Sequence, residues 1–414
     1  MLRQDFSISS LLRVTTKNEI IRFNLGRENK DYRENLLDVS ERLSNNNLVI
    51  ENLNSIKVDG KSIYSTDSIY THYALKKISK DLKRLYRLDS STRDDISEQL
   101  FRILETSSNY SILRLDIKSF YENIGLSNIL KKINKDKLLS TKSISILREI
   151  ENFVGGGLPR GLSISPVLSE IFMKEIDQSI IRMPEIYYYA RYVDDIIIIS
   201  FHDCDFVYNC INQIFTKSGL SFNNKKFIGN VSKADCKTKD IINFDYLGYK
   251  YVVTNKFHNK KRIVYVELSE DKKRKIKTRI IHSILDRVHN NQTTDREVLL
   301  LNRLKILSSN YPIVKNDDFK GCIKVGMFYS HKLVNKSGIF NEFNVFLSKA
   351  LFSKKNNFFG HSVAQIPYEE KINIIKNICF VKGFKDKVFL NESAESMSDL
   401  KACWRNKRHK RVGK

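Results

Sequence analysis

Two adjacent carboxylates, Asp194 and Asp195, stand between two stretches with strand character. The preceding stretch, Tyr187 to Tyr192, is rich in aromatic residues, and residues 196–199 are all isoleucine. Aromatic and β-branched residues favour strands, so the pattern predicts a hairpin whose turn carries both aspartates. Like charges at such a turn repel each other, and a divalent cation that prefers oxygen ligands, such as Mg²⁺, would remove the repulsion. The alternative is an ordinary polar turn, in which aspartate is common.

A third carboxylate, Asp116, lies at the end of a predicted buried strand within residues 111–124. A lone aspartate at this position could instead cap a following helix. If the fold brings Asp116 beside Asp194 and Asp195, three carboxylates form a cage for two Mg²⁺ ions about 3.5–4 Å apart. Such a pair of ions stabilises the attacking and leaving oxygens of a phosphoryl transfer, and the sequence therefore predicts that reaction class if the three residues converge.

A glycine-rich loop follows, in residues 154–161, and leads into an apolar helix that begins near Ser163 or Ser165 and runs towards Asp177. Glycines allow the backbone to approach a ligand closely, and a helix start offers free amides. The loop lacks the Walker pattern, so the sequence excludes a P-loop NTPase.

The chain of 414 residues carries a formal net charge of +24, with 71 basic and 47 acidic residues. The basic residues cluster in residues 256–277 and again after Trp404, which favours nucleic acid as a partner over a merely solubilising charge. A hydrophobic content of 41% suffices for two or three domains. The six cysteines form no Cys-x-x-Cys pair, and we see neither a signal peptide nor an apolar run that would span a membrane. We therefore expect a cytoplasmic protein without a membrane partner.

Periodicity predicts several further elements, whereas residues 1–60 suggest no role. A polar stretch that begins at Asp89 resembles a helix cap. The predicted helices cover residues 69–88, 96–106, 206–217, 269–288, 296–308 and 368–380, and residues 244–253 alternate as a hairpin strand does.

Taken in order, five stretches resemble the palm motifs of reverse transcriptases, over roughly residues 85–255. They are Asp116-Ile-Lys-Ser-Phe-Tyr for motif A, Gly157-Leu-Pro-Arg-Gly with Ser165-Pro-Val-Leu-Ser-Glu for motif B, Tyr192-Val-Asp-Asp for motif C, residues 219–227 for motif D and Phe244-Asp-Tyr-Leu-Gly-Tyr for motif E. The resemblance implies an α/β (α+β) right-hand polymerase with fingers, a palm with a short antiparallel sheet and a helical thumb. The expected parts are an N-terminal extension (1–60), fingers (61–110), palm (111–252, with a finger insertion at about 125–155), thumb (253–345) and a helical C-terminal extension with a basic tail (346–414).

Motif B also suggests a subtype. Most reverse transcriptases carry glutamine where this chain has Arg160, and the surrounding residues look like those of bacterial abortive-infection and defence-associated reverse transcriptases. Many bacterial relatives have alanine where motif C has Val193. Some members of this class are thought to extend DNA without an ordinary template, so the resemblance leaves template handling open.

The resemblance implies a role for each matching residue. The metal ligands of two Mg²⁺ ions, with Mn²⁺ as an alternative, are Asp116, Asp194, Asp195 and the Ile117 carbonyl. Tyr121 would exclude ribonucleotides, unless it is simply a core tyrosine, and Lys226 (or Lys225) would protonate pyrophosphate. The remaining nucleotide-binding residues are Arg93, Gly157, Pro159 and Arg160. The nucleic-acid-binding residues are Tyr192 near the primer end, Phe244, Leu247, Gly248 and Tyr249 in the primer grip, and Lys272, Lys273, Arg274 and Lys275 in a thumb helix.

The function that follows is Mg²⁺-dependent, RNA-templated DNA synthesis from dNTPs, associated with a non-coding RNA and serving bacterial antiphage defence. Homo-oligomers or a complex with a second defence protein are compatible with the resemblance. The alternatives are a template-independent or protein-primed DNA polymerase of the same fold, and a non-catalytic RNA-binding subunit. An RNA polymerase is disfavoured by Tyr121.

Overall fold

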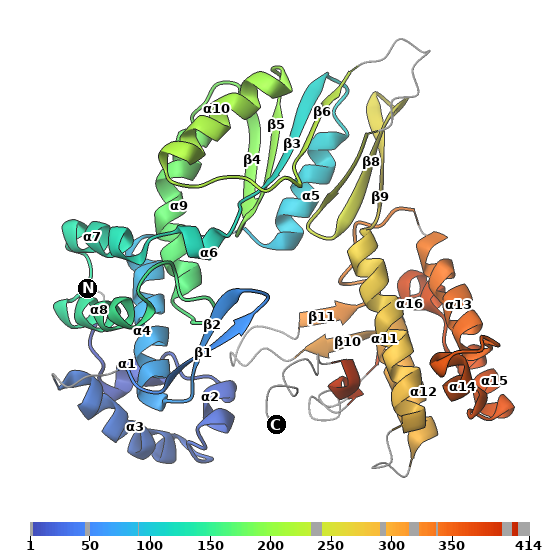
Figure 1. Ribbon diagram of the computed structural model, residues 1–414, viewed down its shortest axis with the longest axis horizontal. Coiled ribbons are helices and arrows are strands. Elements are labelled where there is room, and N and C mark those ends of the chain that lie inside the picture. The colour runs from blue at the N-terminus through green and yellow to red at the C-terminus, as the bar shows by residue number, and fades with distance from the viewer. Residues whose placement is uncertain are drawn as a thin grey trace. The chain divides into compact units, whose positions relative to one another are not determined.

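The computed structural model describes residues 3–45, 50–89, 91–232, 242–289, 295–313, 323–336, 338–390 and 400–404. The predicted basic tail beyond Trp404 lies outside these residues. The chain forms two compact units, shown in Figure 1. The first unit comprises residues 1–96 and 108–233, and the second comprises residues 97–107 and 234–414. No helix in the described ranges has the length and apolar character that a membrane span requires.

The first unit combines helices with six strands in its described residues. The helices are α1 (Ile8–Leu12), α2 (Lys17–Arg22), α3 (Asn29–Ser44), α4 (Ile69–Leu85), α6 (Phe120–Asn123), α7 (Leu126–Asp136), α8 (Thr141–Val154), α9 (Ser165–Ile181) and α10 (Cys204–Lys217). The strands are β1 (Leu53–Val58), β2 (Lys61–Thr66), β3 (Tyr110–Asp116), β4 (Ile186–Tyr192), β5 (Asp195–Ser200) and β6 (Phe227–Val231). Helix α5 (Arg93–Leu104) begins in this unit and continues into the second.

Four strands of the first unit form one antiparallel sheet in the order β4-β5-β3-β6. Residues 196–199 of β5 are all buried, with at most 1% of each side chain exposed. Because successive side chains of a strand point to opposite faces, this burial means that both faces of β5 are covered. Helices α9 and α10 pack against this sheet (Figure 1). The predicted hairpin and the predicted buried strand before Asp116 are therefore confirmed.

The N-terminal residues, for which the sequence suggested no role, belong to the core of the first unit. Leu11 of α1 and Leu36 of α3 are fully buried in the same cluster as Ile196 and Ile198 of the sheet. Strands β1 and β2 form a separate hairpin whose turn residues, Asp59 and Gly60, have positive φ angles of 50° and 76°. Such a turn matches the right-handed twist of two antiparallel strands.

The second unit holds a three-stranded antiparallel sheet and a group of helices. Its strands are β7 (Ile242–Tyr246), β8 (Tyr249–His258) and β9 (Lys261–Leu268), with a second pair, β10 (Asn310–Ile313) and β11 (Ile323–Gly326). Its helices are α11 (Glu270–His289), α12 (Arg296–Ser308), α13 (Gly338–Leu351), α14 (Phe358–Ala364), α15 (Tyr368–Asn377) and α16 (Phe380–Lys385), followed by a 3₁₀ turn, η1 (Ala402–Trp404).

Three predicted elements differ from the observed ones. Helix α5 begins at Arg93, inside the polar stretch, because Thr92 and Asp95 form a reciprocal cap in which each side chain binds the other's amide. The predicted helix 368–380 is divided between α15 and α16, since the Phe380 amide donates to Asn344. Residues 244–253 contain two strands and not one, joined by a tight turn at Leu247 and Gly248.

Candidate active site at the end of the four-stranded sheet

The three predicted carboxylates come from neighbouring strands. Asp116 ends β3 and Asp195 begins β5, and these two residues are direct partners in the antiparallel register. Directly opposed residues in such a ladder have Cα atoms about 4.5–5.5 Å apart. Asp194 lies in the two-residue turn before β5, where its carbonyl accepts a hydrogen bond of 3.0 Å from the Ile117 amide. The fold therefore brings Asp116, Asp194 and Asp195 to one end of the sheet.

The turn between β4 and β5 is held by a buried arginine. Val193 has a φ angle of +60°, which is strained for a β-branched residue. Arg191 Nη1 donates to the Val193 carbonyl at 3.0 Å, and the same guanidinium binds Glu170 and Asp177 of α9, each at 2.7 Å. Burial disfavours the charged form of Arg191, but hydrogen bonds to Asp177 and Glu170 outweigh it and raise its pKa. Sequence reasoning missed Arg191, although it immediately precedes motif C.

Electrostatics at the sheet end favour a cation. Burial raises the pKa of Asp194 and the pKa of Asp195, and the neighbouring carboxylates raise both further. Arg114 opposes this effect at Asp195, since its Nη2 lies 2.6 Å from Asp195 Oδ1. Arg114 and Asp116 are two residues apart on β3 and therefore share a face of the sheet, a signal that the sequence already contained.

The carboxylates engage protein donors in this structure. Arg114 binds Asp195, and the Asn223 side-chain amide donates to Asp116. Among the described residues, Asp116, Asp194 and Asp195 do not bring one ligand atom each to within 4.8 Å of one another, whereas Asp203, Cys204 and Asp205 at the start of α10 do. Three carboxylates that repel one another are nevertheless the donor set that suits a hard divalent cation. The chemistry of the residues at the sheet end thus fits such a cation.

Tyr121 and Arg160 form a platform next to Asp194. Burial raises the pKa of the Tyr121 phenol. The charge of Arg160 lowers this pKa and the charge of Asp194 raises it, so both charges lie close to the Tyr121 ring. Arg160 Cζ is 5.2 Å from the Tyr121 ring centroid, and Nε and Nη2 donate to Glu122 at 3.1 and 3.3 Å. A Cβ atom at Gly157 would lie 2.4 Å from the Glu122 carbonyl oxygen, so only glycine permits this approach.

The β1–β2 hairpin reaches the same platform from the N-terminal part of the chain. The Tyr64 amide donates to the Arg160 carbonyl at 2.7 Å, and a Cβ at Gly161 would meet the Tyr64 carbonyl oxygen at 2.4 Å. Burial raises the pKa of Glu122, but the hydrogen bond from Arg160, a backbone amide, and the charges of Arg160 and Lys61 together outweigh it, so the net shift of the pKa is downward. Sequence reasoning missed Lys61, which the Asp59-Gly60 turn signal between two strand-like runs could have indicated.

Other predicted nucleotide-binding residues lie around this platform. The Pro159 carbonyl accepts a hydrogen bond of 2.6 Å from Ser165 Oγ and so ties the glycine-rich loop to the start of α9. Arg93 opens α5 and is among the groups that lower the pKa of Asp195. Lys226 Nζ lies 3.8 Å from the Tyr208 ring centroid on α10, whereas the carbonyl of Lys225 accepts from Arg114. The structure thus ties the Lys225 backbone to the arginine that binds Asp195.

The predicted nucleic-acid-binding residues divide into exposed and buried ones. Tyr192, at the end of β4, is 40% exposed. Phe244, Leu247 and Tyr249 are at most 7% exposed, so their side chains pack within the second unit. The fourth predicted residue, Gly248, lies in the turn between β7 and β8, with a φ angle of +77°.

The four basic residues predicted on the thumb helix also differ among themselves. Lys273 binds Glu270 at 2.8 Å, and Arg274 forms an ion pair with Asp271. Lys272 Nζ lies 4.8 Å from the Tyr249 ring centroid, and Lys275 is exposed. The helix therefore neutralises part of its own positive charge.

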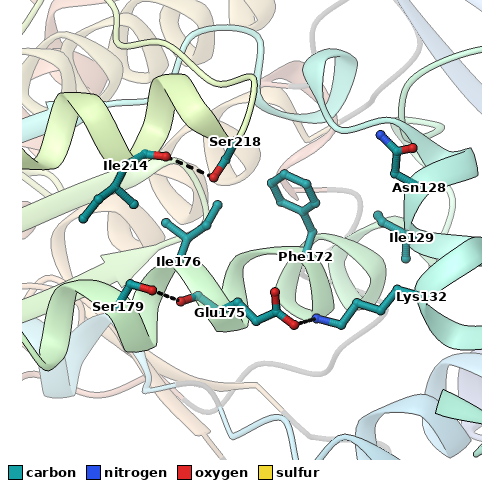
Figure 2. A pocket seen from close by; sticks show the side chains of 9 residues that line it. All are labelled: Asn128, Ile129, Lys132, Phe172, Glu175, Ile176, Ser179, Ile214 and Ser218. Carbon is teal, nitrogen blue, oxygen red and sulfur yellow. Dashed lines mark hydrogen bonds and ion pairs between the residues drawn. The ribbon is translucent and has the colours of Figure 1, made fainter. Parts of the chain in front are cut away.

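A separate cavity of about 390 Å³ lies between α7, α9 and α10 (Figure 2). Phe172 and Ile176 of α9 supply apolar walls, and Lys132 Nζ forms a 2.6 Å ion pair with Glu175 Oε1 beside them. None of the predicted site residues, all of which the structure describes, lines this cavity. This cavity is therefore separate from the residues that the sequence analysis predicted to carry the chemistry.

Comparisons with known proteins match this chain to one family and to several solved structures. The family described as "Reverse transcriptase (RNA-dependent DNA polymerase)" matches residues 30–251. No curated protein matches. Among solved structures, the telomerase from Candida tropicalis in complex with a TWJ fragment of telomeric RNA is similar, with 13% identity, a TM-score of 0.36, and coverage of 86% of this chain and 61% of that one.

The telomerase from Candida albicans in complex with a TWJ fragment of telomeric RNA is also similar, with 13% identity, a TM-score of 0.32, and coverage of 81% of this chain and 56% of that one. The chain thus spans less than two thirds of the length of either telomerase. At these TM-scores, neither likeness supports a conclusion about this chain.

Proposed function

Because the chain belongs to the reverse transcriptase (RNA-dependent DNA polymerase) family, we propose that it synthesises DNA by Mg²⁺-dependent nucleotidyl transfer from dNTPs. The observation that carries this proposal is the register of the sheet, in which Asp116 faces Asp195 and Asp194 occupies the adjoining turn. The platform of Tyr121 and Arg160 beside Asp194 supports it further. The reaction joins the 3′ hydroxyl of a growing DNA strand to the α-phosphate of a dNTP and releases pyrophosphate.

The residues at the sheet end would hold the reacting groups. Asp116, Asp194 and Asp195, with the Ile117 carbonyl as a further ligand, would hold two Mg²⁺ ions, or Mn²⁺ ions in their place. When bound, these ions lower the charge on the phosphate and activate the hydroxyl. Arg114 Nη2 lies 2.6 Å from Asp195 Oδ1 and would keep this carboxylate paired and oriented at the sheet end.

The platform would select and orient the nucleotide. The Tyr121 ring would lie under the sugar and exclude a 2′-hydroxyl, which favours deoxynucleotides over ribonucleotides. Arg160, Gly157 and Pro159 would line the nucleotide and template pocket, while Arg93 would reach the triphosphate. We add Lys61 to this set, because its charge already acts on Glu122 of the platform.

Leaving-group protonation and strand binding complete the proposed machinery. Lys226 or Lys225 would protonate pyrophosphate, and Tyr192 would pack near the primer end. The turn at Gly248, supported by Phe244, Leu247 and Tyr249, would form the primer grip, and the basic face of α11 would form part of a thumb. The first unit would then contain most of the fingers and the palm as far as residue 233, and the second unit the rest of the palm, the thumb and the extension.

The RNA template and the biological setting are parts of the same proposal. The motif B variant at Arg160 supports a bacterial antiphage reverse transcriptase that associates with a non-coding RNA and, in some form, with further copies of itself or a second defence protein. We expect it in the cytoplasm. The same variant supports a second candidate, a template-independent or protein-primed DNA polymerase, because Arg160 is bound to Glu122 and contacts the Tyr121 ring.

One experiment separates these candidates. Purified protein is supplied with Mg²⁺, labelled dNTPs and a DNA primer annealed to an RNA template, and Asp194→Asn is compared with Asp203→Asn. Asp203 caps α10 outside the sheet end, and asparagine retains the cap, so this variant controls for a lost aspartate.

We expect templated DNA from the parent and from Asp203→Asn, and none from Asp194→Asn. Equal synthesis by Asp194→Asn would refute the assignment. Product formed without RNA would favour template-independent synthesis, and label attached to protein would favour protein priming. RNA that is bound without any incorporation under these primer conditions would favour a non-catalytic subunit.

A further inference from the structure

A basic cavity lies in the second unit, between α11 and the last described residues of the chain. Its volume is about 560 Å³, which is within the range of pockets that enclose one organic ligand. Lys275 and Arg279 of α11 line one side, and Lys401 and Trp404 line another. All the lining residues belong to the second unit, so the cavity does not depend on how the two units are arranged.

The cavity concentrates positive charge. Four cationic side chains line it, namely Lys272, Lys275, Arg279 and Lys401, and no lining residue in the described chain is acidic. Residues 272, 275 and 279 follow the three- and four-residue spacing that places side chains on one face of a helix. Like charges gathered around one cavity repel one another and attract anions, so the cavity is suited to a phosphate-bearing ligand.

The opposite groove of α11 provides an internal comparison. It is lined by Lys273, Arg274 and Lys277, but Glu270 also lines it, and Asp271 pairs with Arg274. Positive charge on that side is therefore largely compensated within the helix. Lys275 and Arg279 of α11 instead line the cavity that Trp404 also lines.

Two aromatic rings accompany the cations. Trp404 donates from Nε1 to Ser283 Oγ at 2.9 Å, which fixes its ring against α11, and Arg279 Cζ lies 5.6 Å from its centroid. On the other side, Lys401 Nζ lies 4.5 Å from the centroid of Tyr311. Aromatic rings bind unpaired bases by stacking, whereas cations bind the phosphates between them.

We propose that this cavity binds an unpaired nucleic-acid strand, with phosphates at Lys275, Arg279 and Lys401 and a base against Trp404. The proposal rests on the proposed function only in taking the polyanion to be nucleic acid. A duplex keeps its bases stacked on one another, so it offers no free base face to an aromatic ring that lines a cavity of this size. The site is therefore selective for single strands over the double-stranded product.

The chain contains one tryptophan, so its fluorescence reports directly on the cavity. Full-length protein carrying Asp194→Asn is titrated with a single-stranded RNA, a single-stranded DNA and a blunt duplex of equal length, without Mg²⁺ or dNTPs. We expect either single strand to quench the emission of Trp404, and the duplex to bind at least tenfold more weakly by this signal. The single strand that binds more tightly, RNA or DNA, identifies which of these nucleic acids the cavity accepts.

Salt dependence tests the phosphate contacts. Three contacts predict a slope of log K against log salt of about −2 for a single strand. Lys275→Ala combined with Arg279→Ala should reduce the slope to about −0.7. The control variant combines Lys277→Ala with Lys349→Ala, which also removes two positive charges from the second unit. Neither residue lines the cavity, so the slope should be unchanged.

The base contact is tested separately. A variant that combines Trp404→Phe with Tyr311→Trp keeps an aromatic ring at position 404 and moves the fluorescent tryptophan to position 311. A second variant, which combines Trp404→Ala with Tyr311→Trp, has the same reporter but lacks the ring at position 404. The second variant should bind the single strand about tenfold more weakly than the first.

Three results would each overturn the proposal. They are equal quenching by the duplex, an equal loss of affinity in the two double variants that remove charge, and quenching by inorganic triphosphate alone at the same concentration as the strand. Primer extension by the parent chain is measured in parallel, so a failure of strand binding and a failure of polymerisation are distinguished.

Discussion

The two units each contain a two-residue hairpin turn, and the turns are stabilised in different ways. In the second unit, Leu247 and Gly248 both have positive φ angles, 47° and 77°, and the glycine makes this conformation accessible. In the first unit, Val193 has a φ angle of +60° at a position where hairpin turns favour glycine. The turn in the second unit has glycine at one of its two positive φ angles, whereas the turn at Val193 has no glycine and is held by Arg191 and the Ile117 amide, which bind its two carbonyls.

This difference places backbone strain at the turn that carries part of the candidate active site. A strained turn requires surrounding contacts that over-determine it, and such strain is found at functional sites. The turn at Val193 and Asp194 carries a carboxylate of the candidate active site, and Arg191 ties it to α9, which begins at the motif B loop. Both halves of the proposed site are thereby linked through one buried guanidinium.

The largest expected effect comes from breaking that link. Arg191→Leu leaves Glu170 and Asp177 without their common partner, and removing one member of a buried charge cluster destabilises a protein by about 3–5 kcal/mol. Urea unfolding followed by circular dichroism measures the loss. Arg182→Leu, at the exposed end of α9, should stay within about 0.5 kcal/mol of the parent. Similar stabilities for the two variants would contradict the role of Arg191.

The second unit's turn should respond to a local change. Gly248→Ala places a Cβ in the left-handed region, which costs roughly 1–2 kcal/mol. Gly338→Ala, at the first residue of α13, meets open space and serves as the matched control. Differential scanning calorimetry should show a lower Tm for Gly248→Ala only. An unchanged Tm would mean that this turn, like the one at Val193, is held by contacts beyond its own residues.

Metal binding should sharpen the contrast, because it acts on only one of the turns. At ten times its Kd, Mg²⁺ should stabilise the parent by about 1.4 kcal/mol and leave Asp194→Asn nearly unaffected. Since the pKa values of Asp194 and Asp195 are raised in the folded protein, protons compete with the ion as the pH falls through those values. The gain in Tm should therefore be larger at pH 8 than at pH 5. An equal gain for Asp203→Asn and Asp194→Asn at both values would argue against a site at the sheet end.

The same raised pKa values have a consequence without metal. A carboxylate whose folded pKa exceeds its unfolded pKa lowers stability at every pH above both values, and this penalty disappears as the group becomes protonated. The penalty of Asp194 is thus present at neutral pH and is relieved on acidification. Asp194→Asn should remove it, so the metal-free variant should be the more stable protein at pH 8, with the difference shrinking towards pH 5.

The smallest expected effect concerns the strain itself. Val193→Asn replaces a β-branched residue with one that tolerates a positive φ angle, but it also loses apolar packing against the core. We expect these terms to offset each other to within about 1 kcal/mol, as measured by urea unfolding. A loss of more than about 1 kcal/mol in the free energy of unfolding would show that the packing of Val193 contributes more than its backbone strain costs.

Local patterns were most informative where burial and residue type agree. The four isoleucines of β5, the apolar strand before Asp116 and the start of α9 at Ser165 were all predictable, because each has a clear period or terminal signal. The division of residues 368–380 was not, since it depends on a hydrogen bond to Asn344 from another helix. Motif order likewise located the candidate site before any geometry was known.

The sequence did not show which basic residues of α11 are paired with acidic residues. Lys273 and Arg274 read as the same basic run as Lys272 and Lys275, but only the structure separates the side of α11 that carries its own acids from the side that faces the cavity. The burial of Phe244 and Tyr249 was hidden for the same reason. Contacts between distant segments decide which members of a motif remain available to a ligand.

The amino-acid sequence by itself determined the family, the order of its motifs and the identity of the three carboxylates, because these depend on residue types and their local spacing. The tertiary structure decided that Asp116 faces Asp195, that Arg114 and Arg191 hold the sheet end together, and that Lys61 approaches from the N-terminal part. Strand register and buried ion pairs join residues that are remote along the chain, and no local pattern specifies such partners.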